Sequence, residues 1–213
     1  MNLASWEKKF ENKISEIATV DDPAHDRLHF KRVVQTAKKL CFLEKAGFEV
    51  VVPAAWLHDF VIVPKNSPLR SQASRLAAQG AIEFLKSIQY PKEFFEDIAH
   101  AIEGHSFSAN IDVKTIEAKI VQDADRLDGL GAIGIARCFA TAGLLKRPFY
   151  SDDDPFCENR QPDDSQFTVD HFFKKLFKTA ETLKTKAGIE EGRIRVEVMK
   201  NYLSALSSEV VIL

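Results

Sequence analysis

Apolar residues recur every three or four positions along most of the chain, which is the spacing of one face of an α-helix. The pattern predicts a first helix over about residues 5–20. A second helix is expected to be capped by Asp22, to carry Pro23 in its first turn and to end near Gly47. Further helices are predicted over residues 71–88, 91–104, 115–124, 132–145, 169–186 and 190–206. Because the helix at 132–145 is built from small apolar residues, we expect it to pack tightly against others.

The most apolar stretch, residues 50–62, begins with three valines, so its sequence is compatible with either a strand or a buried helix. We expect a buried helix, because the apolar run is long and no partner strand is evident nearby. His58 and Asp59 interrupt this run side by side. The loop that follows, from about Val63 to Pro68, should therefore lie near whatever the pair binds.

The longest segment without helical periodicity covers residues 147–166 and is rich in proline and aspartate. A loop of this length in a compact domain is usually a lid, a binding loop or disordered. With about nine helices and little strand, the rest of the chain predicts an all-α bundle. The length of 213 residues is most simply a single domain.

Composition narrows the class of protein. The chain is 45% hydrophobic and 28% charged, as in ordinary globular proteins, and its net charge of -2 gives no strong signal for nucleic acid or anionic membrane. Its cysteines show no CxxC spacing, so neither a disulfide framework nor a structural zinc site is expected, and Cys41 and Cys138 should be reduced core thiols. No signal peptide or apolar run of membrane length is evident, which predicts a cytoplasmic protein.

The candidate chemistry centres on His58 and Asp59. An ionised carboxylate among apolar residues is costly unless it is paired or bound to a cation, and imidazole with carboxylate suits divalent transition metals. His29 lies on an apolar helix face, and Asp125 lies near the junction of two helices. Taken singly, such a histidine is more often a structural residue, and Asp125 is as readily a helix cap. Together the four residues predict a metal site.

In this order and at these separations, the four residues resemble the H…HD…D signature of the HD-domain superfamily of metal-dependent phosphohydrolases. The chain is most similar to small bacterial HD hydrolases with the pattern HDxxHxxRV, which here runs from His25 to Val33. Similar stretches continue at residues 54–59 (AAWLHD), 104–108 (GHSFS), 121–128 (VQDADRLD) and 171–176 (HFFKKL). The resemblance covers nearly the whole chain and implies one HD-domain helical bundle over residues 1–213.

The resemblance implies that His29, His58, Asp59 and Asp125 bind one divalent ion, which is Mn, Fe, Co, Ni, Zn or Mg. His29 is preferred to His25 because the first ligand of the family is followed four residues later by a small aliphatic residue, here Val33. A second ion stays open, since His25 and His105 could support it. Asp123 is expected outside the metal shell, because a helix would direct it elsewhere.

Two imidazoles and two carboxylates leave about two positions of an octahedral ion for water, whose pKa the ion lowers. We therefore expect hydrolysis of a phosphoester or phosphoanhydride, in a small phosphorylated substrate such as a nucleotide, by attack of metal-bound hydroxide. Asp59 would be both ligand and proton acceptor, and His105 would donate to a phosphoryl oxygen or protonate the leaving group. The residues expected to bind substrate are His25, Lys65, Asn66, Arg126 and Asp128.

Two other functions remain open from the sequence. A catalytically silent HD domain would bind a nucleotide or metal as a sensor, without turnover. A structural protein would use the aspartate-rich segment 151–164 as a surface for a partner. A homodimer stays open as well.

Overall fold

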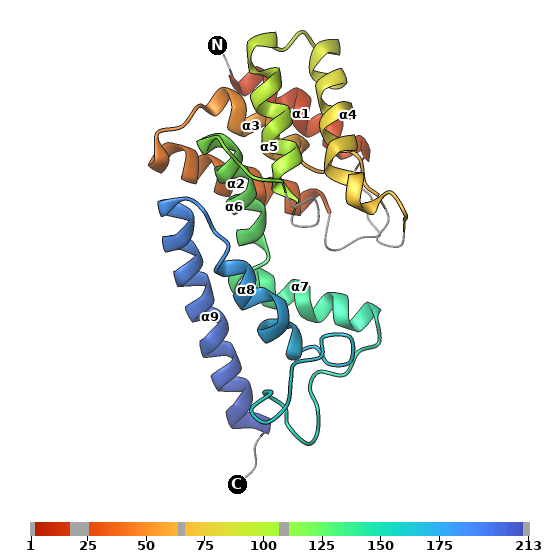
Figure 1. The fold of residues 1–213 in the computed structure, drawn as a ribbon, viewed down its shortest axis with the longest axis vertical. Coiled ribbons are helices and arrows are strands. Elements are labelled where there is room, and N and C mark those ends of the chain that lie inside the picture. The colour runs from red at the N-terminus through yellow and green to blue at the C-terminus, as the bar shows by residue number, and fades with distance from the viewer. Residues whose placement is uncertain (1–2, 18–25, 64–66, 107–110, 211–213) are drawn as a thin grey trace. The chain divides into compact units, whose positions relative to one another are not determined.

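The computed structural model describes residues 3–17, 26–63, 67–106 and 111–210. Within these ranges every regular element is helical, from α1 to α9, with three short 3-10 or π segments labelled η1 to η3 (Figure 1). The predicted all-α fold is therefore confirmed. The chain divides into two compact units, Met1–Asp125 with Lys184–Gly188 and Arg126–Leu183 with Ile189–Leu213. That the whole chain is one domain stays a prediction.

The first unit contains the helices α1 (Leu3–Ile17), α2 (Arg27–Glu44), α3 (Phe48–Leu57), α4 (Ala73–Ser87), α5 (Phe95–His105) and most of α6 (Ile116–Asp128), with η1 (Arg70–Gln72) and η2 (Lys92–Phe94) before α4 and α5. In Figure 1, α4 and α5 run side by side, and α3 contacts α1, α2 and α5. Every residue of α3 from Val50 to Leu57 is buried. A helix that is apolar all round must be covered on all sides, and here its neighbours supply that cover.

Inside α3, Pro53 lacks the N–H that would bond to the carbonyl four residues earlier, that of Glu49. The hydroxyl of Tyr90 donates to this carbonyl at 2.7 Å. The side chain therefore replaces the missing backbone bond, and the helix passes through the proline. The preference for a buried helix over a strand at residues 50–52 is confirmed.

The second unit contains α7 (Gly131–Leu144), the π-helix η3 (Phe172–Leu176), α8 (Phe177–Ala180) and α9 (Lys186–Val210) from Ile189 onward. Contacts between aromatic rings join its elements. Phe172 stacks on Tyr202 with ring centroids 6.2 Å apart, and Phe139 meets Phe149 edge to face at 5.2 Å. These contacts join η3 to α9 and α7 to the segment after it.

Several predicted boundaries differ from the structure. The helix α2 begins at Arg27 with Asp26 as its cap, and not at Pro23, while Asp22 and Pro23 lie outside the described residues. The helix α6 continues through Asp125 to Asp128. In place of one helix over 169–186 there are a π turn and the single turn α8. In the predicted tightly packed helix, α7, only Gly131, Gly134 and Ala142 are buried, because apolar composition does not show which face finds a partner.

The described part of the chain has no single helix with the length and apolar composition of a membrane span. Only α6 and α7, taken together as one bent pair, have both the required length and the required apolar composition. Among the described residues the segment from Arg147 to Thr168 contains no helix.

Candidate metal centre

The first histidine of the candidate site, His29, sits in the first turn of α2. Asp26 caps this helix, and its carboxylate accepts the backbone N–H of His29 at 2.8 Å. A cap of this kind satisfies a donor that the helix leaves unpaired. The aspartate of the HDxxH pattern thereby fixes the backbone that carries the histidine, a role that the motif alone did not reveal.

His58 and His105 are oriented by the same local device. Each lies at the end of its helix, and its Nδ1 is held by the carbonyl three residues earlier: Ala55 at 2.9 Å for His58, and Ile102 at 2.6 Å for His105. A ring whose Nδ1–H donates to a carbonyl directs its Nε2 to the other side, and in a neutral ring that Nε2 carries the lone pair. The helix α3 ends at Leu57, so the predicted helix to Ile62 is too long, and His58 and Asp59 lie at its end.

The polar side chains of four elements converge in the first unit. The Nε2 of His29 lies 3.2 Å from the Nε2 of His58 and 3.5 Å from Oδ1 of Asp125, which is itself 3.9 Å from the Nε2 of His58. The two oxygens of Asp59 lie 3.6 Å from the Nε2 of His58 and 3.5 Å from the Nε2 of His105. The structure thus brings together all four predicted ligands and the predicted proton donor.

The separations come close to those around a divalent ion. Donor atoms about 2.1 Å from one ion stand roughly 3.0–3.4 Å from each other, and the separations here run from 3.2 to 3.9 Å. Two groups of three qualify by spacing, His29 with His58 and Asp125, and His58 with Asp59 and His105. His58 belongs to both groups, so the residues can hold a metal ion around its Nε2.

Burial differs between the two kinds of donor. His29 and His58 are 1% and 0% exposed, whereas the side chains of Asp59 and Asp125 are 26% and 29% exposed. The imidazoles therefore form the floor of the site and the carboxylates its open edge. Of these four side chains, the two carboxylates are the ones that solvent reaches.

The electrostatics of His58 suit a neutral ligand. Burial lowers its pKa to about 4, against the opposing charge of Asp59. The ring of Phe30 packs against it, with centroids 5.1 Å apart, and keeps water away. Its Nε2 lone pair is therefore available at neutral pH.

His105 has the opposite tendency. Burial alone lowers its pKa, but the hydrogen bond and charge of Asp59 outweigh burial and raise the pKa to about 9. A cation bound by Asp59 would draw that charge away and return the pKa of His105 toward its ordinary value. The protonation of His105 is thus tied to what Asp59 binds.

Asp123 and Asp125 lie on the same helix but contact different parts of the protein. The carboxylate of Asp123 is fully buried and accepts from the backbone N–H groups of Lys184 and Thr185 at 2.7–3.1 Å, and from the hydroxyl of Thr185 at 2.7 Å. It anchors the chain at the start of α9. Its expected position outside the metal cluster agrees with these contacts.

Other predicted site residues are engaged elsewhere or lie outside the described residues. Arg126 donates to the carbonyl of Thr182 at 2.7 Å, and buried Asp128 pairs with Arg137 at 2.7 Å, both within the second unit. The structure gives these two residues structural contacts, and their binding of substrate stays a prediction. His25, Lys65 and Asn66 lie outside the described residues, so their predicted roles also stay open.

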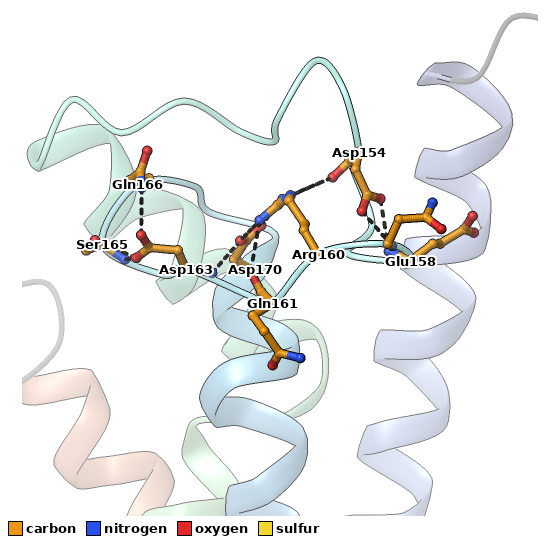
Figure 2. A network of polar contacts seen from close by, with 9 residues as sticks. Asp154, Glu158, Arg160, Gln161, Asp163, Ser165, Gln166 and Asp170 are labelled. Atoms are coloured by element: carbon orange, nitrogen blue, oxygen red, sulfur yellow. Dashed lines mark hydrogen bonds and ion pairs between the residues drawn. The ribbon is translucent and has the colours of Figure 1, made fainter.

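Hydrogen bonds within the aspartate-rich loop of the second unit stabilise its conformation (Figure 2). Asp154 accepts two backbone N–H groups at 2.9 and 2.8 Å, and Asp163 accepts from the side chains of Ser165 and Gln166. Arg160 donates to the backbone oxygen of Asp154 and to both oxygens of Asp170. Several carboxylates of the loop therefore accept hydrogen bonds from the loop itself and stabilise its fold.

Comparison with known proteins gives the family. The profile of the HD domain matches residues 27–130, which include the five converging residues. The protein YpgQ of Bacillus subtilis strain 168 is 30% identical over 201 residues, which cover 92% of this chain and 90% of YpgQ.

Solved structures agree over almost the full length. The crystal structure of YpgQ covers 99% of this chain and 98% of its own at 30% identity, with a TM-score of 0.76. The structure of YpgQ in complex with ADP covers 96% and 97% at 29% identity, with a TM-score of 0.72. An HD-superfamily hydrolase from Bacillus thuringiensis covers 95% and 96% at 29% identity, with a TM-score of 0.71. By sequence and by fold, this chain belongs to the HD-domain family, among its phosphohydrolase-type proteins.

Proposed function

We propose that this protein is a metal-dependent phosphohydrolase that cleaves a phosphoester or phosphoanhydride of a nucleotide. The observation that supports it most is the pair of Nε2 atoms of His29 and His58 at 3.2 Å, with carboxylate oxygens of Asp125 and Asp59 at 3.5 and 3.6 Å from one or the other. Two imidazoles and two carboxylates make a donor set for a hard or borderline divalent ion. Such an ion polarises a phosphoryl oxygen and lowers the pKa of water, which is the chemistry that hydrolysis of a phosphate needs.

The chain's own residues would manage the protons. In hydrolysis the oxygen of water bonds to phosphorus, the bond from phosphorus to the leaving oxygen breaks, and one proton moves from the water side to the leaving side. Asp59 lies at the open edge and can accept the proton that water loses. The Nε2 of His105 lies 3.5 Å from Asp59, and in its protonated form His105 can donate a proton to the leaving oxygen.

Two observations support the substrate class: the charge at the open edge of the site and the ligand bound in a related structure. The open edge of the site consists of carboxylates, so an anionic phosphate would not bind there without a cation to bridge the two. YpgQ, which shares 29–30% of its residues with this chain, has been solved in complex with ADP. We therefore favour a nucleoside phosphate over an unrelated phosphoester.

A metal-reconstituted activity screen tests the proposal. The purified protein would be stripped of metal, loaded in turn with Mn, Co, Ni, Fe, Zn and Mg, and incubated with a panel of nucleotides and phosphoesters. Chromatography of the nucleotides and a phosphate assay would detect products, with Asp59→Asn as the control for contaminating phosphatases. We expect turnover with at least one ion that is lost in the variant. Nucleotides that bind tightly and stay intact with every ion would show a sensor and overturn the enzyme assignment.

A further inference from the structure

A second group of polar side chains lies entirely in the second unit. The segment after α7 is tied to the residues just before η3 by three hydrogen bonds. Thr168 donates to the carbonyl of Pro148 from its N–H at 3.0 Å and from its hydroxyl at 2.8 Å, and Val169 N–H donates to the carbonyl of Phe149 at 2.8 Å. These bonds join the residues directly after Arg147 to those directly before the helical turn at His171, and the charge of Arg147 acts on the His171 ring.

His171 is the centre of this group. Its Nδ1 lies 2.8 Å from a carboxylate oxygen of Asp164, and its side chain is 23% exposed. A ring that donates from Nδ1 leaves its Nε2 for another partner, and no hydrogen bond to that atom occurs among the described residues. Burial lowers the pKa of His171, Asp164 raises it, and the positive charges of Lys175 and Arg147 lower it again, so that it lies below its ordinary value.

Arg147 carries an unsatisfied donor. Its Nε is buried and has no hydrogen-bond partner in the described part of the chain. No carboxylate lies within ion-pair distance of its guanidinium among the described residues. Buried donors are nearly always paired, so an orphan of this kind indicates an acceptor supplied from outside.

Two other uses of this group can be set aside. Cys138 lies nearby, but its thiol points to the carbonyl of Thr168 at 3.7 Å, and burial raises its pKa to about 11, so it is not poised as a nucleophile. A cation site would need several carboxylates, whereas the charged groups that act most on His171 are one carboxylate, Asp164, and two cations, Lys175 and Arg147. The excess of positive charge favours an anion.

We propose that Arg147, His171 and Lys175 form a binding site for a phosphate-type oxyanion. A guanidinium fork, an imidazole nitrogen and an ammonium group are the donors that proteins direct at phosphate oxygens. Asp164 fixes the orientation of the imidazole and would leave Nε2 to the ligand. The site lies within the second unit and does not depend on the metal centre or on the activity proposed for it.

The test measures the response of the ring nitrogens of His171 to added anions. In the full-length protein labelled with ¹⁵N-histidine, the ring nitrogens of His171, assigned with His171→Asn, would be recorded during titration with inorganic phosphate, with AMP, and with sodium chloride at equal ionic strength. We expect a saturable shift and a higher pKa of His171 with phosphate and no saturation with chloride. A response to AMP as strong as that to phosphate would identify a phosphate ester as the ligand class, and a response to phosphate alone would identify the free anion.

Matched variants decide between this site and nonspecific attraction. Lys175→Gln changes an exposed side chain and should weaken phosphate binding at least tenfold, as should Arg147→Gln, while Lys178→Gln, an exposed lysine one turn further on, should leave it unchanged. In Asp125→Asn, which removes a predicted metal ligand, the shift at His171 should persist. A shift without saturation, or equal binding in wild type and Lys175→Gln, would overturn the proposal.

Discussion

The Nε2 atoms of His29 and His58 face each other 3.2 Å apart, although 29 positions separate the two residues in the chain. Because the Nδ1–H of neutral His58 donates to the carbonyl of Ala55, its Nε2 carries a lone pair. This lone pair can accept a hydrogen bond from His29 or bind a metal ion. The pair is therefore a preformed point of coordination that the capped start of α2 and the end of α3 hold in place.

Replacing Asp59 by asparagine tests its place in this cluster. The change is nearly isosteric and the side chain is 26% exposed, so the fold should persist with a stability change within about 1 kcal/mol. The amide removes a charged donor, and we expect metal content and activity to fall at least tenfold. Elemental analysis and thermal unfolding would be measured together. Wild-type metal content in a folded variant would remove Asp59 from the coordination sphere.

Asp123 and Asp125 make a matched pair for separating folding from metal binding. Asp123→Asn places an NH₂ group or a neutral oxygen against three donors, so we expect it to lower the free energy of unfolding by about 2–3 kcal/mol. Asp125→Asn should change stability little but reduce metal affinity. Urea unfolding and metal titration of both variants would check this. Equal loss of stability in the two would contradict the separation.

Two glycines of α7 should respond to alanine in opposite directions. A Cβ on Gly134 would lie 2.2 Å from the carbonyl oxygen of Gly129, a backbone atom, whereas a Cβ on Gly143 would meet nothing within 4 Å. We expect Gly134→Ala to destabilise the protein by about 2 kcal/mol or more, because the backbone must shift. Gly143→Ala should stabilise it by about 0.5–1 kcal/mol, because alanine loses less backbone entropy in a helix. Denaturant midpoints measure both changes, and a neutral Gly134→Ala would mean that the α6–α7 corner is looser than the structure shows.

The ion pair of Asp170 and Arg160 should make stability depend on pH. Burial raises the pKa of Asp170, but the guanidinium of Arg160 and the N–H of Asp163 outweigh it, so the folded pKa lies below the ordinary value. A carboxyl with a lowered folded pKa stabilises the protein above its unfolded pKa of about 4 and loses that contribution as the pH falls through the folded value.

We therefore expect Asp170→Asn to lower the free energy of unfolding by about 3 kcal/mol at pH 7, and the difference from wild type to shrink as the pH falls below about 4. Urea unfolding from pH 7 to pH 3 measures it, with the exposed Asp152→Asn as the control that should show no such trend. A constant difference across this range would mean that Asp170 is not ionised in the folded protein.

The sequence by itself determined the fold class and named the candidate residues of the site. Helical spacing of apolar residues is a local property, so the all-α fold and the buried helix around Val51 could be predicted without knowledge of any neighbour. The motif residues His29, His58, Asp59 and Asp125 could likewise be named, because their types and separations carry the family signature.

Only the tertiary structure decided what each side chain does once folded. Asp123 and Asp125 are two residues apart in one helix, and the contact of Asp123 with Thr185 comes from a segment 62 positions away. The hydroxyl of Tyr90, which replaces the helix bond missing at Pro53, comes from 41 positions beyond the carbonyl of Glu49 that accepts it. Local patterns report propensity and polarity, whereas these roles arise from the hydrogen bonds and burial that packing imposes.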